Sequence, residues 1–332
     1  MKGYAKAILH HRRDFYINIL INRVSHKSLT KLFQNLGLKK GDCVFVHCAF
    51  SRLGYFPGGP HGLIRLLQGV VGPQGTIAMP AFPFSGSMQD FLAKPYHFDI
   101  NETPSKVGFL SEAFRTYPGV YRSLHPTHSI CAIGKNAMEL VADHELSVTP
   151  CGTQSPFAKF STINAVLLRI GTGALTLFHH IQELIDYPNL FLPKQLTIRC
   201  KDPFGKEISV RTSVYRKKIP NILFLGYDTS DQLLSVHPRD FPLLYSGDRE
   251  ELLKSDPMRQ LVLNKLRELR AFFVQNGILR IGEINGCKCE LFFIKKFIDY
   301  AVSEEMKLIR RFKEKYALQL LTSLLEKGAY PK

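Results

Sequence analysis

Cys43-Val44-Phe45-Val46-His47 begins the stretch that decides the fold, and its run of apolar residues predicts a buried strand. A glycine-containing loop follows over residues 48–60, and apolar residues then recur with helical spacing over 63–70. The turn Gly72-Pro73-Gln74-Gly75 leads into a second apolar run, Thr76–Pro80. Strand, loop, helix, turn and strand in this order make a βαβ unit, whose two strands are parallel. The stretch therefore predicts an α/β fold.

The loop over residues 48–60 connects the first strand to its helix, where α/β proteins often bind phosphates. It lacks the full glycine fingerprint of dinucleotide-binding loops and the lysine of the phosphate-binding loop, so neither motif is assigned. Backbone N–H groups at the start of the following helix can still bind an anion. The alternative is a tight turn without a ligand.

Length and composition limit the class of protein. The chain has 332 residues, of which 45% are hydrophobic, so it can bury a large core in one domain or two. No apolar run is long enough to span a bilayer, and the first residues lack the apolar core of a signal peptide. The number of cysteines is odd, seven, which indicates reduced thiols. These features predict a cytoplasmic protein.

Two short patterns have the residue types of metal sites. Cys287-Lys288-Cys289 is too closely spaced for the usual zinc pairing, and it has no second pair. His125 and His128 are three residues apart, but no third ligand lies near them in sequence. We therefore expect no metal.

The net charge of +16 favours anionic partners, such as coenzyme phosphates, nucleotides, anionic lipids or nucleic acids. Residues 1–40 contain nine lysines and arginines but one acidic residue. This segment is either a surface for peripheral contact with an anionic membrane or an ordinary solvated helix face. Because neither a recognition helix nor an aromatic and basic RNA-binding pattern is present, we expect no nucleic acid partner. An oligomer is left open.

The rest of the chain gives a coarse secondary structure. Residues 81–105 show no periodicity, which is typical of a substrate-binding loop. An amphipathic helix is expected from 103 to 115, and alternating residues from 192 to 245 indicate antiparallel strands. Ile278–Gly282 is a predicted strand, and residues 290–328 are predicted to be helical.

Two adjacent histidines follow a predicted strand, Val166–Ile170, and a glycine turn. They belong to the run Thr176-Leu177-Phe178-His179-His180-Ile181-Gln182-Glu183. If this run is helical, His180 and Glu183 lie one turn apart on the same face. A carboxylate that binds one ring nitrogen fixes the tautomer and raises the basicity of the other nitrogen. The pair therefore predicts a general base, and a merely capped or solvated helix start is the alternative.

Several stretches, in their order and spacing, resemble the aminoglycoside 3-N-acetyltransferases, also called the antibiotic N-acetyltransferase family. The resemblance runs from about residue 40 to about 302, and its most specific block is Arg122–Pro126 continuing to Ser129. The other matching pieces are Gly41-Asp42, His47, Ser51–Gly54, Gly58–Pro60, Gly72–Pro80, Phe98-Asp99, Thr103–Ser105, Val107–Arg115, Pro118–Val120, Ala132, Ser155–Phe157, Thr176–Glu183, Gly277–Gly282 and the helix end Phe297–Asp299.

For the fold, the resemblance implies a three-layer α/β/α sandwich with a mixed central sheet and helical N- and C-terminal extensions. The expected division is a basic helical extension over residues 1–38, an acetyltransferase α/β domain over 39–302, and a C-terminal helical extension over 303–332.

For the site, the resemblance implies that His180 and Glu183 are the catalytic pair. The family's threonine stands two or three residues before its histidine, and Thr176 suits His179 in that respect, so His179 stays a candidate base. Phe98 and Asp99 would bind the acceptor substrate. The implied coenzyme A-binding residues are His47, Cys48, Ser51, Arg52, Leu53, Gly54, Gly58, Gly59, Ser123, Leu124, His125, Pro126 and Ser129.

The sequence departs from the family pattern near the expected acyl-carrier path. Cys48 stands where a small alanine or serine is usual, and Ala81 stands where a threonine usually follows Met-Pro. Because thiolates accept acyl groups, a covalent route through Cys48 is an alternative to direct transfer.

For the reaction, the resemblance implies transfer of an acetyl group from acetyl-CoA, the co-substrate, to a primary amine of an amino sugar. His180 would remove the amine proton, and backbone N–H groups of the Ser51–Gly54 loop or the His125 turn would stabilise the oxyanion. Because the chain is basic, we expect an anionic acceptor, such as a nucleotide-linked amino sugar or an acidic glycan. The alternatives are an aminoglycoside-resistance enzyme and a non-enzymatic basic module that binds anionic surfaces.

Overall fold

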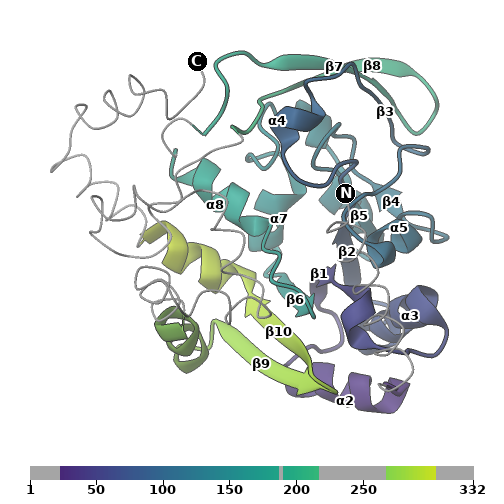
Figure 1. Ribbon diagram of the computed structural model, residues 1–332, viewed down its shortest axis with the longest axis vertical. Coiled ribbons are helices and arrows are strands. Elements are labelled where there is room, and N and C mark those ends of the chain that lie inside the picture. The colour runs from purple at the N-terminus through teal and green to yellow at the C-terminus, as the bar shows by residue number, and fades with distance from the viewer. Residues whose placement is uncertain (1–22, 187–189, 217–266, 304–332) are drawn as a thin grey trace, which may run out of the picture.

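A mixed β-sheet forms the centre of the molecule (Figure 1). The computed structural model describes residues 23–186, 190–216 and 267–303. Within them β1 pairs in parallel with β2 and β6, and the remaining neighbours in the sheet are antiparallel. The strand order is β4 (Tyr121–Arg122), β5 (Ile130–Gly134), β2 (Thr76–Pro80), β1 (Cys43–Cys48), β6 (Val166–Ile170), β10 (Cys287–Phe293) and β9 (Leu279–Ile284).

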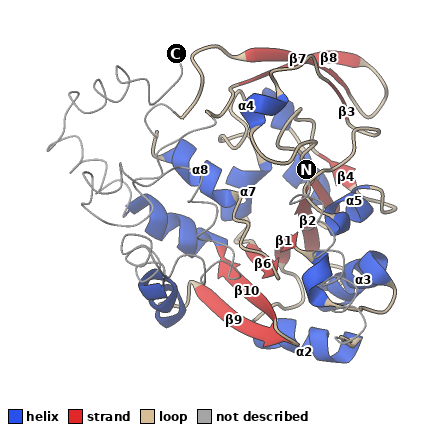
Figure 2. Cartoon of the chain, viewed as in Figure 1, coloured by secondary structure: helices blue, strands red, loops and turns tan. Residues whose placement is uncertain are grey.

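Both faces of this sheet are covered, which follows from the alternation of side chains along β1. Phe45 packs in one hydrophobic cluster, whereas Val44 and Val46 pack in the other. Helices cover both faces of the sheet (Figure 2). On the Val44 side lie α2 (His26–Asn35), α3 (Gly59–Val71) and α5 (Phe109–Arg115), and on the Phe45 side α6 (Ala137–Val141), α7 (Pro156–Thr162), α8 (Leu177–Leu184) and helical residues 294–303. The predicted α/β fold with a mixed central sheet is confirmed.

The βαβ unit predicted from the first stretch is present, with Cys43 opposite Thr76 in the parallel register. The connection reaches α3 through η1 (Phe50–Leu53) and Gly58, whose left-handed φ of 76° disfavours other residues. Gly62 allows a close approach, because a β-carbon there would lie 2.2 Å from the carbonyl oxygen of Pro57. The loop is thereby held against the first turn of α3.

The helix predicted from residue 290 is wrong at its start, because residues 287–293 form β10. β10 runs antiparallel to β6, and its Glu290 binds the guanidinium groups of Arg169 and Arg270. Pairing with a central strand, together with this buried ion pair, overrides the local apolar pattern. The strand predicted over 278–282 is confirmed as β9.

A second, three-stranded sheet consists of β3 (His97–Asp99), β7 (Leu196–Lys201) and β8 (Glu207–Thr212). The antiparallel strands expected after residue 192 are β7 and β8. The segment 81–105, expected to be an irregular substrate loop, contains α4 (Met88–Phe91) and β3, which pairs in parallel with β7. Because β3 pairs with a strand about a hundred residues away, its sequence has no local periodicity, and the strand was not predicted.

Near the N-terminus, α2 joins the core of the central domain. Val24, Leu29 and Phe33 are buried in the same cluster as Val44, so the expected basic extension contributes to the core before residue 38. Three expected parts lie outside the described residues: the helical extension before residue 23, the portion of the antiparallel strands after residue 216, and the C-terminal extension from 304. No helix among the described residues is long and apolar enough to cross a bilayer.

Candidate active site

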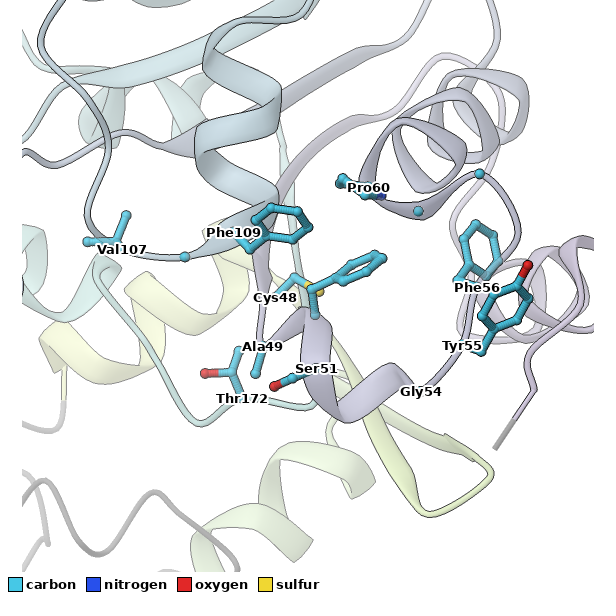
Figure 3. A pocket seen from close by; sticks show the side chains of 14 residues that line it. Cys48, Ala49, Ser51, Gly54, Tyr55, Phe56, Pro60, Val107, Phe109 and Thr172 are labelled. Atoms are coloured by element: carbon cyan, nitrogen blue, oxygen red, sulfur yellow. The ribbon is translucent and has the colours of Figure 1, made fainter. Parts of the chain in front are cut away.

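A cavity of about 750 Å³ opens at the carboxyl end of β1 (Figure 3). The loop predicted to bind a phosphate forms most of its wall, and the segment before α5 forms the opposite side. Its size and its mixture of aromatic and glycine residues are typical of a cofactor or substrate pocket. The cavity is lined by Cys48, Ala49, Phe50, Ser51, Gly54, Tyr55, Phe56, Gly58, Gly59, Pro60, Val107, Gly108, Phe109 and Thr172.

Two features of this wall suit a coenzyme. The N-terminus of the 13-residue helix α3 lies at the cavity, where the helix dipole favours an anion, although the Gly59 amide already donates to the carbonyl of Phe56 and Pro60 has no N–H. Phe109, with 66% of its surface exposed, faces Phe50 at a ring distance of 6.0 Å. A phosphate at the helix start and an aromatic base beside these rings would use both features.

The residues predicted to bind coenzyme A from the first loop are divided between cavity and core. Besides His47 and Leu53, six residues of this loop were predicted, and five of the six are on the wall. Leu53 is fully buried. His47 turns into the core, where its Nδ1 donates to the carbonyl of Ala174 and its Nε2 accepts from the hydroxyl of Thr176. Burial lowers the pKa of His47 to about 4, so this ring is neutral. The wall residues are Cys48, Ser51, Gly54, Gly58 and Gly59.

The predicted coenzyme-binding block 123–129 lies elsewhere and is buried. Nδ1 of His125 accepts from the amides of Thr127 and His128, and Nε2 of His125 lies 3.3 Å from the hydroxyl of Thr212. Ser123 Oγ lies 2.8 Å from His144 Nδ1. Leu124, Pro126 and Ser129 are buried as well, and none of the predicted residues in this block lines the cavity. Its contacts fix the turn between β4 and β5.

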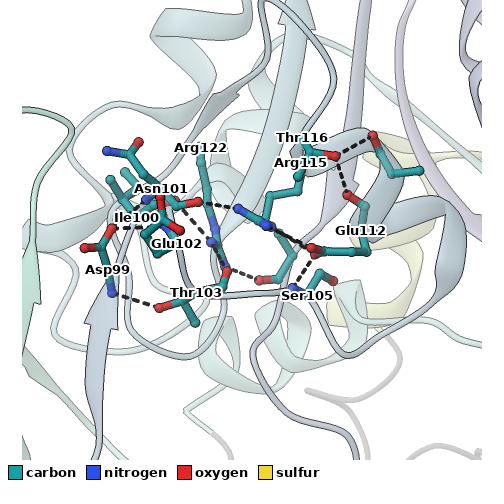
Figure 4. Close-up of polar contacts among 12 residues, drawn as sticks. Asp99, Ile100, Asn101, Glu102, Thr103, Ser105, Glu112, Arg115, Thr116 and Arg122 are labelled. Carbon is teal, nitrogen blue, oxygen red and sulfur yellow. Dashed lines mark hydrogen bonds and ion pairs between the residues drawn. The ribbon is translucent and has the colours of Figure 1, made fainter.

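Of the two predicted acceptor residues, Asp99 belongs to a polar network that also contains Arg122 (Figure 4). Phe98 is fully buried, and the guanidinium of Arg122 lies 4.8 Å from the centre of its ring. Asp99 accepts from the amides of Asn101 and Glu102. Arg122 in turn donates to main-chain carbonyls of segment 81–103, so the network braces this segment.

His180 does not bind Glu183 in the way the spacing predicts. Nδ1 of His180 lies 2.6 Å from the carbonyl oxygen of Cys151, and Glu183 accepts from the amide of the same Cys151. Glu183 also accepts from the hydroxyl of Tyr215. Burial raises the pKa of Glu183, against the hydrogen bonds from Thr149, Tyr215 and Cys151. The histidine and the carboxylate therefore hold one loop residue between them.

His179, the other candidate base, makes the i, i+3 side-chain contact that was expected of His180 and Glu183. Its Nδ1 lies 3.1 Å from Oε1 of Gln182, one helical turn on. Its ring stacks on Tyr215 at 4.5 Å and meets the ring of His128 edge-on at 6.0 Å. Burial lowers the pKa of His179, so the imidazole is neutral at neutral pH.

A smaller cavity of about 450 Å³ lies beside α8. His180, Glu183 and Asp186 contribute its ionisable groups, and Leu190 and Phe191 contribute apolar surface. The two carboxylates give this wall a local negative charge within a basic chain.

The thiols of the site are poor nucleophiles. Burial, and to a lesser degree the neighbouring Cys287, raise the pKa of Cys48 well above its usual value, so the thiol stays protonated. In the part of the chain that the structure describes, no group of three or more His, Cys, Asp or Glu side chains could hold a metal ion.

Sequence reasoning missed two residues of the site, Gln182 and Tyr215. The i, i+3 rule that selected Glu183 for His180 also selects Gln182 for His179, so this signal was present. Tyr215 follows β8, more than thirty residues after His179, and no local pattern marks it.

The chain matches the family model described as aminoglycoside 3-N-acetyltransferase over residues 45–304. It is 35% identical over 167 residues to aminoglycoside N(3)-acetyltransferase IX of Micromonospora chalcea, a match that covers 46% of this chain and 59% of that protein. It is also 35% identical over 180 residues to aminoglycoside N(3)-acetyltransferase VII of Streptomyces paromomycinus, covering 50% of this chain and 62% of that protein. The matches thus span about three fifths of these relatives.

Solved structures show the same fold. The complex named AAC-IIIb binary with CoASH superposes with a TM-score of 0.61 at 24% identity, covering 85% of this chain and 96% of that one. Aminoglycoside acetyltransferase AAC(3)-Xa superposes with a TM-score of 0.66 at 23% identity, covering 89% of this chain and 98% of that one. Because the family model covers most of the chain, the protein belongs to the aminoglycoside 3-N-acetyltransferase family.

Proposed function

We propose that the protein is an acetyl-CoA-dependent N-acetyltransferase that acts on a primary amine of an aminoglycoside-type amino sugar. The observations that carry the proposal are the large cavity at the end of β1 and a neutral histidine on α8 whose ring is held by Gln182. Family membership supports the reaction class, and a family member solved with coenzyme A bound supports the co-substrate.

Acetyl-CoA would occupy the cavity of the 48–60 loop. The start of α3 suits a phosphate, and the rings of Phe50 and Phe109 suit the adenine. The thioester end would then point towards α8, because Thr172 lines the cavity and Thr176 contacts His47, the neighbour of Cys48.

His179 is the base in this proposal. A chain of contacts connects His179 to the wall of the large cavity. The ring of His128, which meets His179, packs on Phe82. The carbonyl of Phe82 accepts from the amide of Lys106, which precedes the wall residue Val107. His180 instead faces Cys151 and the smaller cavity. Since an ammonium cannot attack a thioester, His179 would take the proton at Nε2 as the nitrogen attacks the thioester carbon. The C–S bond would then break, and coenzyme A would leave as the thiol with the proton that His179 returns.

The transfer would be direct. Cys48 is protonated, which disfavours an acyl-enzyme. The amides of Thr127 and His128 are used by the ring of His125, so the 51–54 loop is the better source of donors for the oxyanion.

The net charge of +16 predicted an anionic acceptor, but the names of the relatives favour an aminoglycoside. Glu183 and Asp186 line the smaller cavity that His180 faces, so an acidic wall for the further amino groups of a polycationic acceptor lies next to the proposed base on α8. Because nearby charges act more strongly than distant, screened ones, this wall can outweigh the basic surface.

A thiol-release assay with acetyl-CoA tests the function. The panel should contain aminoglycosides, a nucleotide-linked amino sugar and neutral glucosamine. We expect turnover with an aminoglycoside and a rise in melting temperature with coenzyme A. A basic binding module would show neither, and turnover confined to the nucleotide-linked sugar would restore the anionic acceptor.

A further inference from the structure

We propose that Gln182 is the positioning residue of the catalytic histidine, His179, and that this chain supports its base with a neutral amide rather than a carboxylate. This inference rests on the proposed function. The family resemblance places a histidine and a glutamate three residues apart, and in this sequence that spacing occurs at His180 and Glu183. The side-chain contact that such a pair is expected to make occurs one position earlier, between His179 and Gln182.

The contact fixes the tautomer that a base requires. Nδ1 of His179 lies 3.1 Å from Oε1 of Gln182, and an amide oxygen can only accept, so Nδ1 carries the proton. The lone pair is then on Nε2, the nitrogen that would take the proton from the acceptor amine. Gln182 is almost fully buried, which restricts its side chain to few conformations.

Glu183 acts elsewhere, on Tyr215. The carboxylate accepts from the Tyr215 hydroxyl and from the amide of Cys151, and the Tyr215 ring stacks on His179 at 4.5 Å. The negative charge is therefore separated from the imidazole by an aromatic ring. Glu183 holds the surface on which His179 rests, but it does not bind either histidine.

The ionisable surroundings of His179 are few among the described residues. His128 and Tyr215 contact its ring, Glu183 and Cys151 lie behind Tyr215, and His180 is its helix neighbour. None of these places a carboxylate against Nδ1. A proton on His179 is thus stabilised by an amide dipole alone, and the ring should remain neutral to lower pH than a carboxylate-paired histidine.

Two reciprocal substitutions test this arrangement: Gln182→Glu replaces the amide by a carboxylate, and Glu183→Gln replaces the carboxylate by an amide. In Gln182→Glu a carboxylate meets Nδ1 of His179, which raises the pKa of the ring. Activity that requires the neutral ring is lost as pH falls, so the acidic limb of the kcat profile should move upward by about one pH unit or more. Above that limb kcat should rise several-fold. Glu183→Gln should lower kcat without moving the limb.

A second readout does not depend on turnover. Nitrogen-15 spectra of the histidine rings, assigned with His179→Asn, should show the Nδ1-protonated tautomer in the wild type. Gln182→Met keeps the side-chain size but removes the acceptor, and it should mix the tautomers and lower kcat at least tenfold, with coenzyme A affinity unchanged. Melting curves of each variant show whether it is folded.

The opposite results overturn the proposal. If Glu183→Gln moves the acidic limb and Gln182→Glu does not, the base is His180. If the wild-type spectrum shows His179 protonated at Nε2, Gln182 does not position it, and this result requires none of the Gln182 and Glu183 variants to fold. Absence of turnover with every amine would reject the proposed function, while the ring spectrum would still decide the tautomer.

Discussion

The 48–60 loop and the 123–129 block were both predicted to bind coenzyme A, yet only the loop lines the cavity. The loop exposes aromatic rings and glycine backbone to a volume of about 750 Å³. The block buries Ser123, His125 and Ser129 and uses their polar atoms inside the protein. Residues of one family pattern can therefore differ in their surroundings: those of the loop face a cavity, whereas those of the block are buried among partners within the protein.

The largest loss of activity is expected for a substitution in α8, which with its N-cap contacts His47 before the loop and His128 of the block. His179→Ala should lower kcat by about 100- to 10,000-fold, because general-base catalysis contributes that much. Coenzyme A should still raise the melting temperature, since the cavity wall is intact. The measurement is thiol release at saturating substrates, together with thermal unfolding.

The matched control is His180→Ala, which removes the contact with Cys151 but not the proposed base. It should lower kcat less than His179→Ala and should lower the melting temperature more. The reverse order of the two kcat values would assign catalysis to the His180–Glu183 side of the helix.

In the buried block, Ser123→Ala should cost stability rather than coenzyme binding. Ser123 Oγ is paired with His144 and accepts from the amide of Ile130, so its loss leaves buried polar groups without a partner. The expected loss is about 1–3 kcal/mol of unfolding free energy. Denaturant unfolding measures it, and titration of the folded variant should give an unchanged coenzyme A affinity. Weaker binding with unchanged stability would return the block to the coenzyme site.

The sequence was sufficient where the determinants are local. The apolar runs at 43–47 and 76–80, with the glycine loop and helix between them, predict the βαβ unit and the cavity-forming loop. It was insufficient for β3 and β10, whose strand form depends on pairing with β7 and β6. The same limit applies to the site: spacing selected a histidine and a carboxylate, but Cys151 and Tyr215, brought in from other parts of the fold, determine which groups meet.

On the cavity wall, Phe109→Ala should weaken coenzyme A binding by about tenfold, because stacking of a base on an aromatic ring contributes roughly 1–3 kcal/mol. Stability should hardly change, since 66% of the Phe109 surface is exposed. Phe204→Ala is the matched control: Phe204 is 93% exposed in the β7–β8 turn, away from the cavity lining. Equal coenzyme affinity in both variants would remove the stacking role.

The smallest effect is expected at Cys48, which lines the cavity but lies at the end of a buried strand. Its raised pKa leaves little thiolate at neutral pH, and a thiol is a weak acyl acceptor. Cys48→Ala should therefore change the KM for acetyl-CoA by no more than a few-fold, through altered packing, and should leave kcat close to that of the wild type. Rapid quenching of the wild type during turnover should yield no acetylated protein by intact mass. An acetyl group trapped on Cys48, with kcat lost in the alanine variant, would replace direct transfer by a two-step route in which the cavity wall itself carries the acyl group.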